Sequence, residues 1–114
     1  MNSDRAVGFS RTLALVFGGF LAVIEIVYNW QNPSWWPFIL VDYIAVAMLV
    51  YGALRSNVVL VAGWGFTCAM FYMSFFMAFE LGQDTLVILG KGVLFSLTIA
   101  GLVLALKGVR GGAV

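Results

Sequence analysis

Four ionisable side chains fall within or at the edge of long apolar stretches of this sequence, where a charge is costly to hold. They are Glu25, Asp42, Glu80 and Lys91. A carboxyl group in an apolar setting can hold a proton or attract a cation or an amine, and a neighbouring ammonium group can neutralise it. If the fold brings these residues together, their chemistry predicts a site for protons, cations or a cationic solute.

Other chemistry has little support in the residue types. The chain has no histidine, and Cys68 is its one cysteine, which argues against an intramolecular disulfide bond and a cysteine-based metal centre. It contains no phosphate-binding glycine loop, no HExxH pattern and no paired nucleophile and base. A formal net charge of +1 gives no basic surface for nucleic acid. We therefore predict no catalytic residue, no metal, no cofactor and no nucleic-acid partner.

The composition identifies the setting of the ionisable residues. Of 114 residues, 63% are hydrophobic and 10% are charged, whereas a soluble chain carries about 25% charged residues. The mean hydropathy is +1.05. A soluble domain of this size needs far more polar surface, because small domains have a high ratio of surface to volume. The composition predicts an integral membrane protein in contact with the lipid bilayer.

Four apolar stretches are separated by turn-forming residues, and we expect each to form a transmembrane helix. They cover residues 12–28, 36–54, 58–79 and 85–106. Each has about the ~20 residues that a helix needs to cross ~30 Å of hydrocarbon. Short connections make consecutive helices antiparallel neighbours. The expected fold is all-α: a polytopic membrane protein with four antiparallel transmembrane helices in one up-down-up-down bundle, a single domain over residues 1–114.

Basic residues are distributed unevenly between the two ends of this bundle. Five of the six lysine and arginine residues fall at the end that carries both termini: Arg5, Arg11, Arg55, Lys107 and Arg110. Because basic residues are enriched on the cytoplasmic side, we expect a multi-pass protein of the cell membrane with cytoplasmic N- and C-termini. The opposite end is rich in the aromatic residues of a membrane-interface belt, namely Tyr28, Trp30, Trp35 and Trp36.

Helical geometry places the ionisable residues at a similar depth near the non-cytoplasmic end. Glu25, Asp42 and Lys91 are each expected roughly 5–10 Å inside that boundary, and Glu80 at its rim. We therefore predict one charged layer, with residues from all four helices, as the site for ions or solute. Two tyrosines are expected to shape its mouth, Tyr43 and Tyr72.

The first helix indicates which way Glu25 faces. Ala14, Gly18 and Ala22 precede Glu25 on one stripe of the helix surface. Small residues in such a stripe allow a second helix to approach closely. Glu25 is therefore expected to face a neighbouring helix.

Two other interpretations compete with solute handling. In the first, Lys91 neutralises Glu25 or Asp42, the charges only fix helix order, and the chain is a structural or accessory subunit of a larger membrane complex. In the second, a stripe of Met and Phe residues on the third helix lines a pocket for a lipophilic ligand. This stripe consists of Phe66, Met70, Met73 and Met77. We expect the chain to be a homo-oligomer or part of a larger membrane complex.

Trp64 lies between Gly63 and Gly65 inside the third span. We expect the glycines to permit a close helix crossing, and the tryptophan to act as an anchor at the cytoplasmic membrane interface.

Two resemblances in outline accompany these features. Four spans, short length and Glu25 in the first helix make the chain similar to small multidrug resistance transporters, which are antiparallel dimers that use a first-helix glutamate for proton-coupled export. The one-sided charge distribution and the presence of Asp42 depart from that family. The segment from Pro33 to Asp42, with Glu80 ending the next span, is similar in outline to the EXPERA sterol-isomerase group, but the connections are shorter here. Neither resemblance assigns a family.

Overall fold

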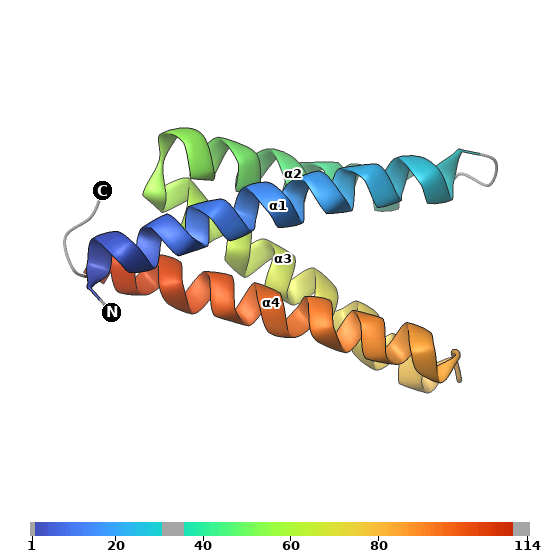
Figure 1. The fold of residues 1–114 in the computed structure, drawn as a ribbon. Coiled ribbons are helices and arrows are strands. Elements are labelled where there is room, and N and C mark those ends of the chain that lie inside the picture. Colours follow the sequence, from blue (N-terminus) through green and yellow to red (C-terminus); the bar gives the residue numbers. More distant parts are fainter. Residues whose placement is uncertain (1, 31–35, 111–114) are drawn as a thin grey trace.

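The protein is an all-α bundle of four helices. The computed structural model describes residues 2–30 and 36–110, apart from the side chains of Ser3 and Phe38. The helices are α1 (Ser3–Asn29), α2 (Trp36–Arg55), α3 (Asn57–Glu80) and α4 (Thr85–Arg110). They run alternately in opposite directions, so that the start of α1 and the end of α4 lie together at one end of the bundle (Figure 1). The predicted up-down bundle is confirmed.

The observed helices extend past the predicted spans, most of all near the termini. α1 begins at Ser3 and α4 continues to Arg110, whereas the apolar stretches begin at residue 12 and end at residue 106. The reason is that an apolar stretch measures only the part of a helix suited to hydrocarbon. Backbone hydrogen bonding continues through the polar residues beyond it.

Local signals in the sequence account for the helix ends. The side chain of Asn2 accepts a hydrogen bond from the backbone N–H of Arg5 at 2.8 Å, and Ser56 accepts one from Val59 at 3.2 Å. Both are standard N-terminal caps. α3 ends in a Schellman motif, in which Gln83 N–H bonds to the Ala78 carbonyl oxygen at 2.9 Å. Gly82 occupies the left-handed position of this motif with φ 64°, where a side chain would be strained.

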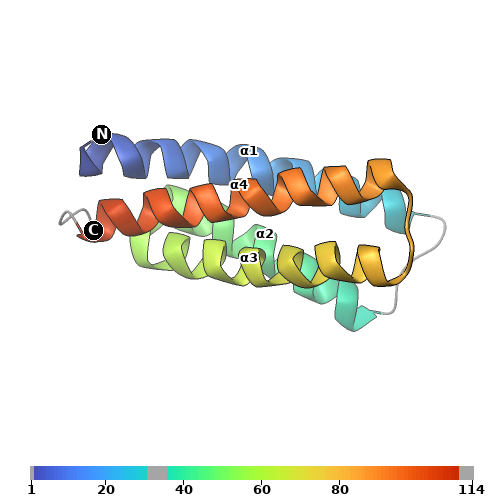
Figure 2. The same cartoon turned by 90° about the horizontal axis from the view of Figure 1, so that it is seen from below.

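The four helices form two layers. α1 packs beside α2 and α3 packs beside α4, while α1–α4 and α2–α3 contacts join the two layers. The layers meet at the end that holds the termini and diverge toward the other end (Figure 1). Viewed at right angles, the helices run roughly along one common axis (Figure 2). We call the two ends the terminal end and the far end.

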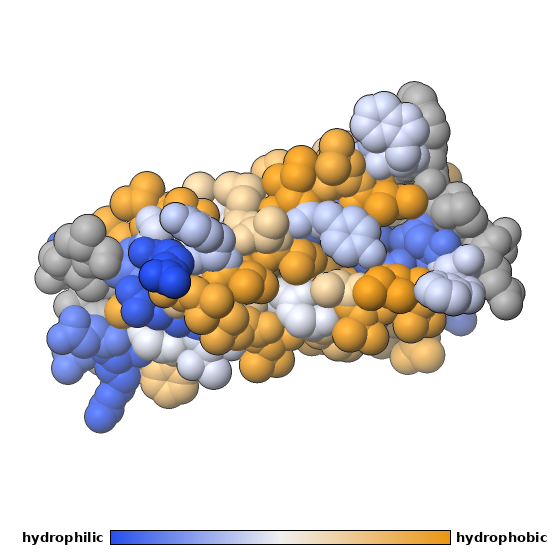
Figure 3. Space-filling model, turned by 90° about the horizontal axis from the view of Figure 1, so that it is seen from above, coloured by the Kyte–Doolittle hydropathy of each residue, from blue (hydrophilic) through white to orange (hydrophobic). Residues whose placement is uncertain are grey.

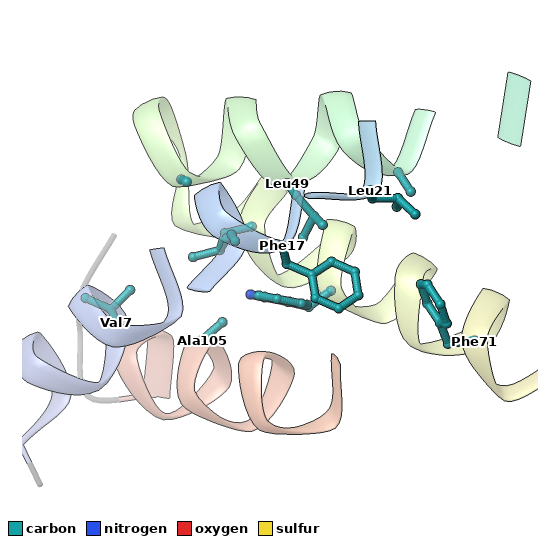
Figure 4. Close-up of a cluster of buried hydrophobic side chains, with 11 residues drawn as sticks. Val7, Phe17, Leu21, Leu49, Phe71 and Ala105 are labelled. Atoms are coloured by element: carbon teal, nitrogen blue, oxygen red, sulfur yellow. The ribbon is translucent and has the colours of Figure 1, made fainter. Parts of the chain in front are cut away.

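The hydrophobic core lies in the half of the bundle nearer the terminal end. Its buried members are Val7, Ala14, Phe17, Leu21, Ala45, Leu49, Ala53, Leu60, Trp64, Phe71 and Ala105. Phe17 lies near its centre (Figure 4) and makes edge-to-face ring contacts with Trp64 and Phe71, with centroids 5.6 and 5.5 Å apart.

The terminal half therefore comprises residues 2–21, 45–71 and 98–110, and the far half comprises residues 22–30, 36–44 and 72–97. Within the described part of the far half, Ala78 is the one buried residue. The two halves thus differ in how tightly the helices pack.

The surface between the two ends is largely apolar, with hydrophilic residues gathered at both ends of the face in Figure 3. Three helices are long and apolar enough to cross a membrane, in α1 (Asp4–Asn29), α3 and α4. The bundle is 43 Å long, which exceeds the ~30 Å thickness of a hydrocarbon core. These features indicate a multi-span membrane protein.

Candidate functional site: a carboxyl pair between α1 and α2

Glu25 and Asp42 meet between α1 and α2 in the far half. The carboxyl groups of Asp42 and Glu25 lie close enough to influence each other. Asn29, one turn after Glu25, donates from Nδ2 to Glu25 Oε2 at 2.9 Å and to the Glu25 backbone carbonyl oxygen at 2.8 Å. Both acids are partly exposed. The fold thus brings together two of the four ionisable residues that the sequence singled out.

The small residues of α1 explain why these two acids meet. Ala14 is fully buried, and Gly18 lies so close to α2 that an added Cβ would be 3.4 Å from Cγ2 of Val50. The two helices therefore run side by side at close range, as the small-residue stripe predicted. Glu25 continues this stripe toward the far end and consequently faces α2, where Asp42 lies.

The predicted single charged layer is wrong, because Glu80 and Lys91 lie apart from the carboxyl pair. Glu80 is exposed, and Lys91 Nζ donates a hydrogen bond to Gln83 Oε1 at 3.1 Å. The described residues include no group of three or more His, Cys, Asp or Glu side chains that is suited to a metal ion. The physical reason is the divergence of the two layers toward the far end (Figure 1), where residues at equal depth on α1–α2 and on α3–α4 lie apart.

The two tyrosines expected at the mouth belong to different layers. Tyr43 follows Asp42 on α2 and is 38% exposed. Tyr72 lies on α3, where its ring contacts Phe76 and Phe95 with centroids 5.0 and 5.9 Å apart. The aromatic contacts of Tyr72 therefore tie α3 to α4.

The Met and Phe stripe of α3 is divided between core and surface. Phe66 and Met70 are partly buried against the hydrophobic core. Met73 and Met77 are 62% and 48% exposed. The stripe thus changes its surroundings along its length, because the core ends near Phe71.

A buried polar cluster in the terminal half was not expected from the sequence. Trp64 is fully buried, and its Nε1–H donates to the hydroxyl oxygen of Ser10 at 2.8 Å. The Ser10 hydroxyl donates in turn to the backbone carbonyl oxygen of Gly101 at 2.8 Å. We call these three residues the Trp64 cluster; it joins α1, α3 and α4.

The expectation that Trp64 anchors the chain at the membrane interface is therefore wrong. The ring fills the centre of the bundle because Gly101 of α4 leaves room for it, and a Cβ at that position would overlap the indole ring. Gly63 does permit a close crossing, since an added Cβ would lie 3.1 Å from the Met48 backbone of α2. A buried indole N–H needs a partner, and Ser10 supplies it.

A second polar contact lies nearer the terminal end. The Arg11 guanidinium group donates from Nε to Asn57 Oδ1 at 3.0 Å, and a second guanidinium N–H reaches the same oxygen. Asn57 is almost fully buried at the start of α3. The sequence signal for both contacts was the presence of Ser10, Arg11 and Asn57 on helices otherwise rich in apolar residues, but nothing in the sequence paired them.

The described residues of the predicted aromatic belt lie at the far end. Tyr28, Trp30 and Trp36 are all exposed, while Trp35 lies outside the described residues.

Comparison with protein-family models, curated proteins and solved structures finds no match to this chain.

Proposed function

We propose that the chain is a small membrane protein that exchanges a proton at the Glu25–Asp42 pair, with cations and cationic solutes competing for the same carboxyl groups. The observation that supports this proposal is the proximity of the two carboxyl groups between apolar helices. Ion pairing with Lys91 does not account for it, because Lys91 bonds to Gln83.

The chemistry of the contact favours proton exchange. Two ionised carboxylates offer only hydrogen-bond acceptors and repel each other, so a pair this close is stabilised when it shares a proton. Asn29 donates to Glu25 from one side, which holds the Glu25 side chain toward Asp42. A proton can leave when a cation takes its place, since either relieves the repulsion between the two carboxyl groups.

The proposal includes a position for the site within the membrane. We take α2 to be a fourth span, because its 20 residues extend about 30 Å at 1.5 Å per residue and it runs antiparallel beside α1. The basic residues at the terminal end then lie in the cytoplasm, and the carboxyl pair lies near the outer surface. Labelling of Q83C and K107C with an impermeant maleimide, in a C68S background, tests this: Q83C should react from outside intact cells and K107C should not.

Proton flux in proteoliposomes tests the central claim. The wild-type chain is reconstituted with an internal pH indicator, a pH gradient is imposed, and its decay is followed with and without sodium. We expect the double variant E25Q/D42N to lose most of the protein-dependent decay. E80Q is the matched control, because Glu80 is exposed and lies apart from the pair, and it should behave as the wild type.

The same samples separate the competing interpretations. If E25Q/D42N retains the full flux, the exchange proposal fails. A flux that is absent from every sample, with stoichiometric copurification of a larger complex after gentle detergent extraction, supports an accessory subunit instead. A lipophile retained in native mass spectra and lost on M73A/M77A would support the ligand-binding interpretation. The extraction also reports whether the chain is a homo-oligomer.

A further inference from the structure

We infer that α1 with α2, and α3 with α4, form two arms that pivot about the Trp64 cluster and open and close the far end of the bundle. This inference does not depend on proton exchange, since it follows from where the helices contact one another.

The hydrogen bonds and ring contacts that join the arms, among the described residues, lie in the terminal half. Among described residues, the hydrogen bonds that join the arms are those of Ser10 with Trp64 and Gly101, and of Arg11 with Asn57. The ring contacts that join the arms are those of Phe17 with Trp64 and Phe71. These contacts all lie at or before the level of Phe71.

The closest backbone approaches between the arms lie in the same half. An added Cβ at Gly52 of α2 would collide with the Leu60 backbone of α3, and one at Gly63 would crowd the Met48 backbone. Backbones this close resist separation and sliding of the arms at this end, because either would lose packing. The terminal half therefore keeps the arms joined at one end.

In the far half, the hydrogen bonds and ring contacts described lie within one arm. Glu25 and Asp42 join α1 to α2. In the other arm, the Phe75 ring lies against Gly92, where an added Cβ would be 3.0 Å from it, and Tyr72 packs on Phe95. Each arm is therefore tied together internally out to the far end.

Because each arm is held together by its own contacts, separation of the arms at the far end costs little free energy. The described far half buries no large side chain between the arms, so little apolar contact is lost when they move apart. Lipid chains can cover the apolar side chains that separation exposes, because hydrocarbon is as apolar as the residues themselves. Rigid elements that share one packed region and diverge beyond it are the usual arrangement for hinge motion, which occurs in microseconds to milliseconds.

Pulsed electron spin resonance between paired spin labels tests the inference in lipid nanodiscs. Labels are placed on exposed positions in a C68S background. The pair V27C/L86C spans the arms at the far end, and F9C/V58C spans them at the terminal end. We expect a distance distribution at least about twice as broad for the far pair as for the terminal pair, as for a hinge that opens away from a fixed point.

A pair within one arm provides the matched control. V23C and V41C lie on α1 and α2 in the far half, and we expect their distribution to be as narrow as that of the terminal pair. A far pair as narrow as the terminal pair overturns the inference. Equal broadening of the far pair and the V23C/V41C pair also overturns it, because it indicates fraying of single helices and not motion of arms.

Two further variants keep the test decisive. V23C/L89C repeats the far measurement with different substitutions, in case a label disturbs folding. W64F keeps a ring but removes the N–H donor to Ser10, and it should broaden the terminal pair F9C/V58C while leaving the V23C/V41C pair unchanged. An unchanged terminal pair in W64F would place the pivot elsewhere and contradict the role given to the Trp64 cluster.

Discussion

The terminal and far halves of this bundle use the same four helices in opposite ways. In the terminal half, Trp64 is fully buried, hydrogen-bonded to Ser10 and packed against Phe17. In the far half, the one buried residue among those described is Ala78, and the prominent contact is between two partly exposed carboxyl groups. Tight packing and the carboxyl pair are thus kept apart along the length of the molecule.

The difference has a physical basis. A side chain contributes to stability in proportion to the contacts and the burial it gains, so the terminal half should carry most of the folding free energy. A carboxyl pair is cheaper to hold where packing is loose and water can approach. The same looseness leaves the far half free to change its shape. Matched substitutions in the two halves test this comparison.

The largest effect is expected from removal of the central tryptophan. W64A leaves a large cavity and frees the Ser10 hydroxyl, so we expect a loss of about 3–5 kcal/mol in the free energy of unfolding, measured by denaturant titration in detergent. W36A is the control, because Trp36 is 66% exposed in the far half, and it should cost less than about 1 kcal/mol. Similar losses for the two variants would contradict the difference between the halves.

Glycine substitutions on α4 sharpen the comparison within a single helix. A methyl group at Gly101 would overlap the Trp64 ring, whereas one at Gly90 meets nothing within 4 Å. We expect G101A to lower the free energy of unfolding by about 1–3 kcal/mol through overpacking. G90A should leave it unchanged or slightly higher. Thermal unfolding in detergent that ranks the two variants the other way would contradict the close packing of the Trp64 ring against Gly101.

The hydroxyl of Ser10 should have an intermediate effect. S10A leaves the buried Trp64 N–H without its acceptor, and we expect a loss of about 1–2 kcal/mol. Ser96 is the control, since its hydroxyl is exposed and donates to Gly92 within its own helix; S96A should have almost no effect. Near-ultraviolet circular dichroism and tryptophan fluorescence measure the change around Trp64 directly, and an S10A spectrum identical to the wild type would argue against the hydrogen bond.

The smallest effect on stability is expected at the carboxyl pair. E25Q and D42N each replace a carboxyl group by an amide that can still form a hydrogen bond, so each should change the free energy of unfolding by less than about 1 kcal/mol. A double-mutant cycle with E25Q/D42N measures the coupling between the two positions. A loss comparable with that of W64A would mean that the pair has a structural role, as in the helix-ordering interpretation.

Much of the fold could be predicted from the sequence. Apolar stretches and short connections gave the number, order and antiparallel direction of the helices, and the stripe of Ala14 and Gly18 indicated that Glu25 faces a neighbour. These are local properties, since helix length, periodicity and turns depend on residues close together in the chain. The helix bounds were less accurate at α1 and α4, where polar residues extend the helices.

The candidate site could be predicted only in part. Depth along a helix follows from residue numbers, so the common level of Glu25, Asp42 and Lys91 was readily expected. Their separation across the bundle depends on how the two layers diverge. The sequence therefore predicted a common level for these charges, but it did not indicate that Lys91 bonds to Gln83 and that the two acids lie together.

The sequence by itself determined that the chain is apolar and forms four helices, because composition and hydrophobic periodicity are properties of residues close together in the chain. Only the tertiary structure decided that Trp64 lies at the centre and that its N–H reaches Ser10, because this arrangement requires Gly101, from a helix distant in sequence, to leave the space that the ring occupies. Side-chain packing is a property of several helices at once, and no single helix contains the information that fixes it.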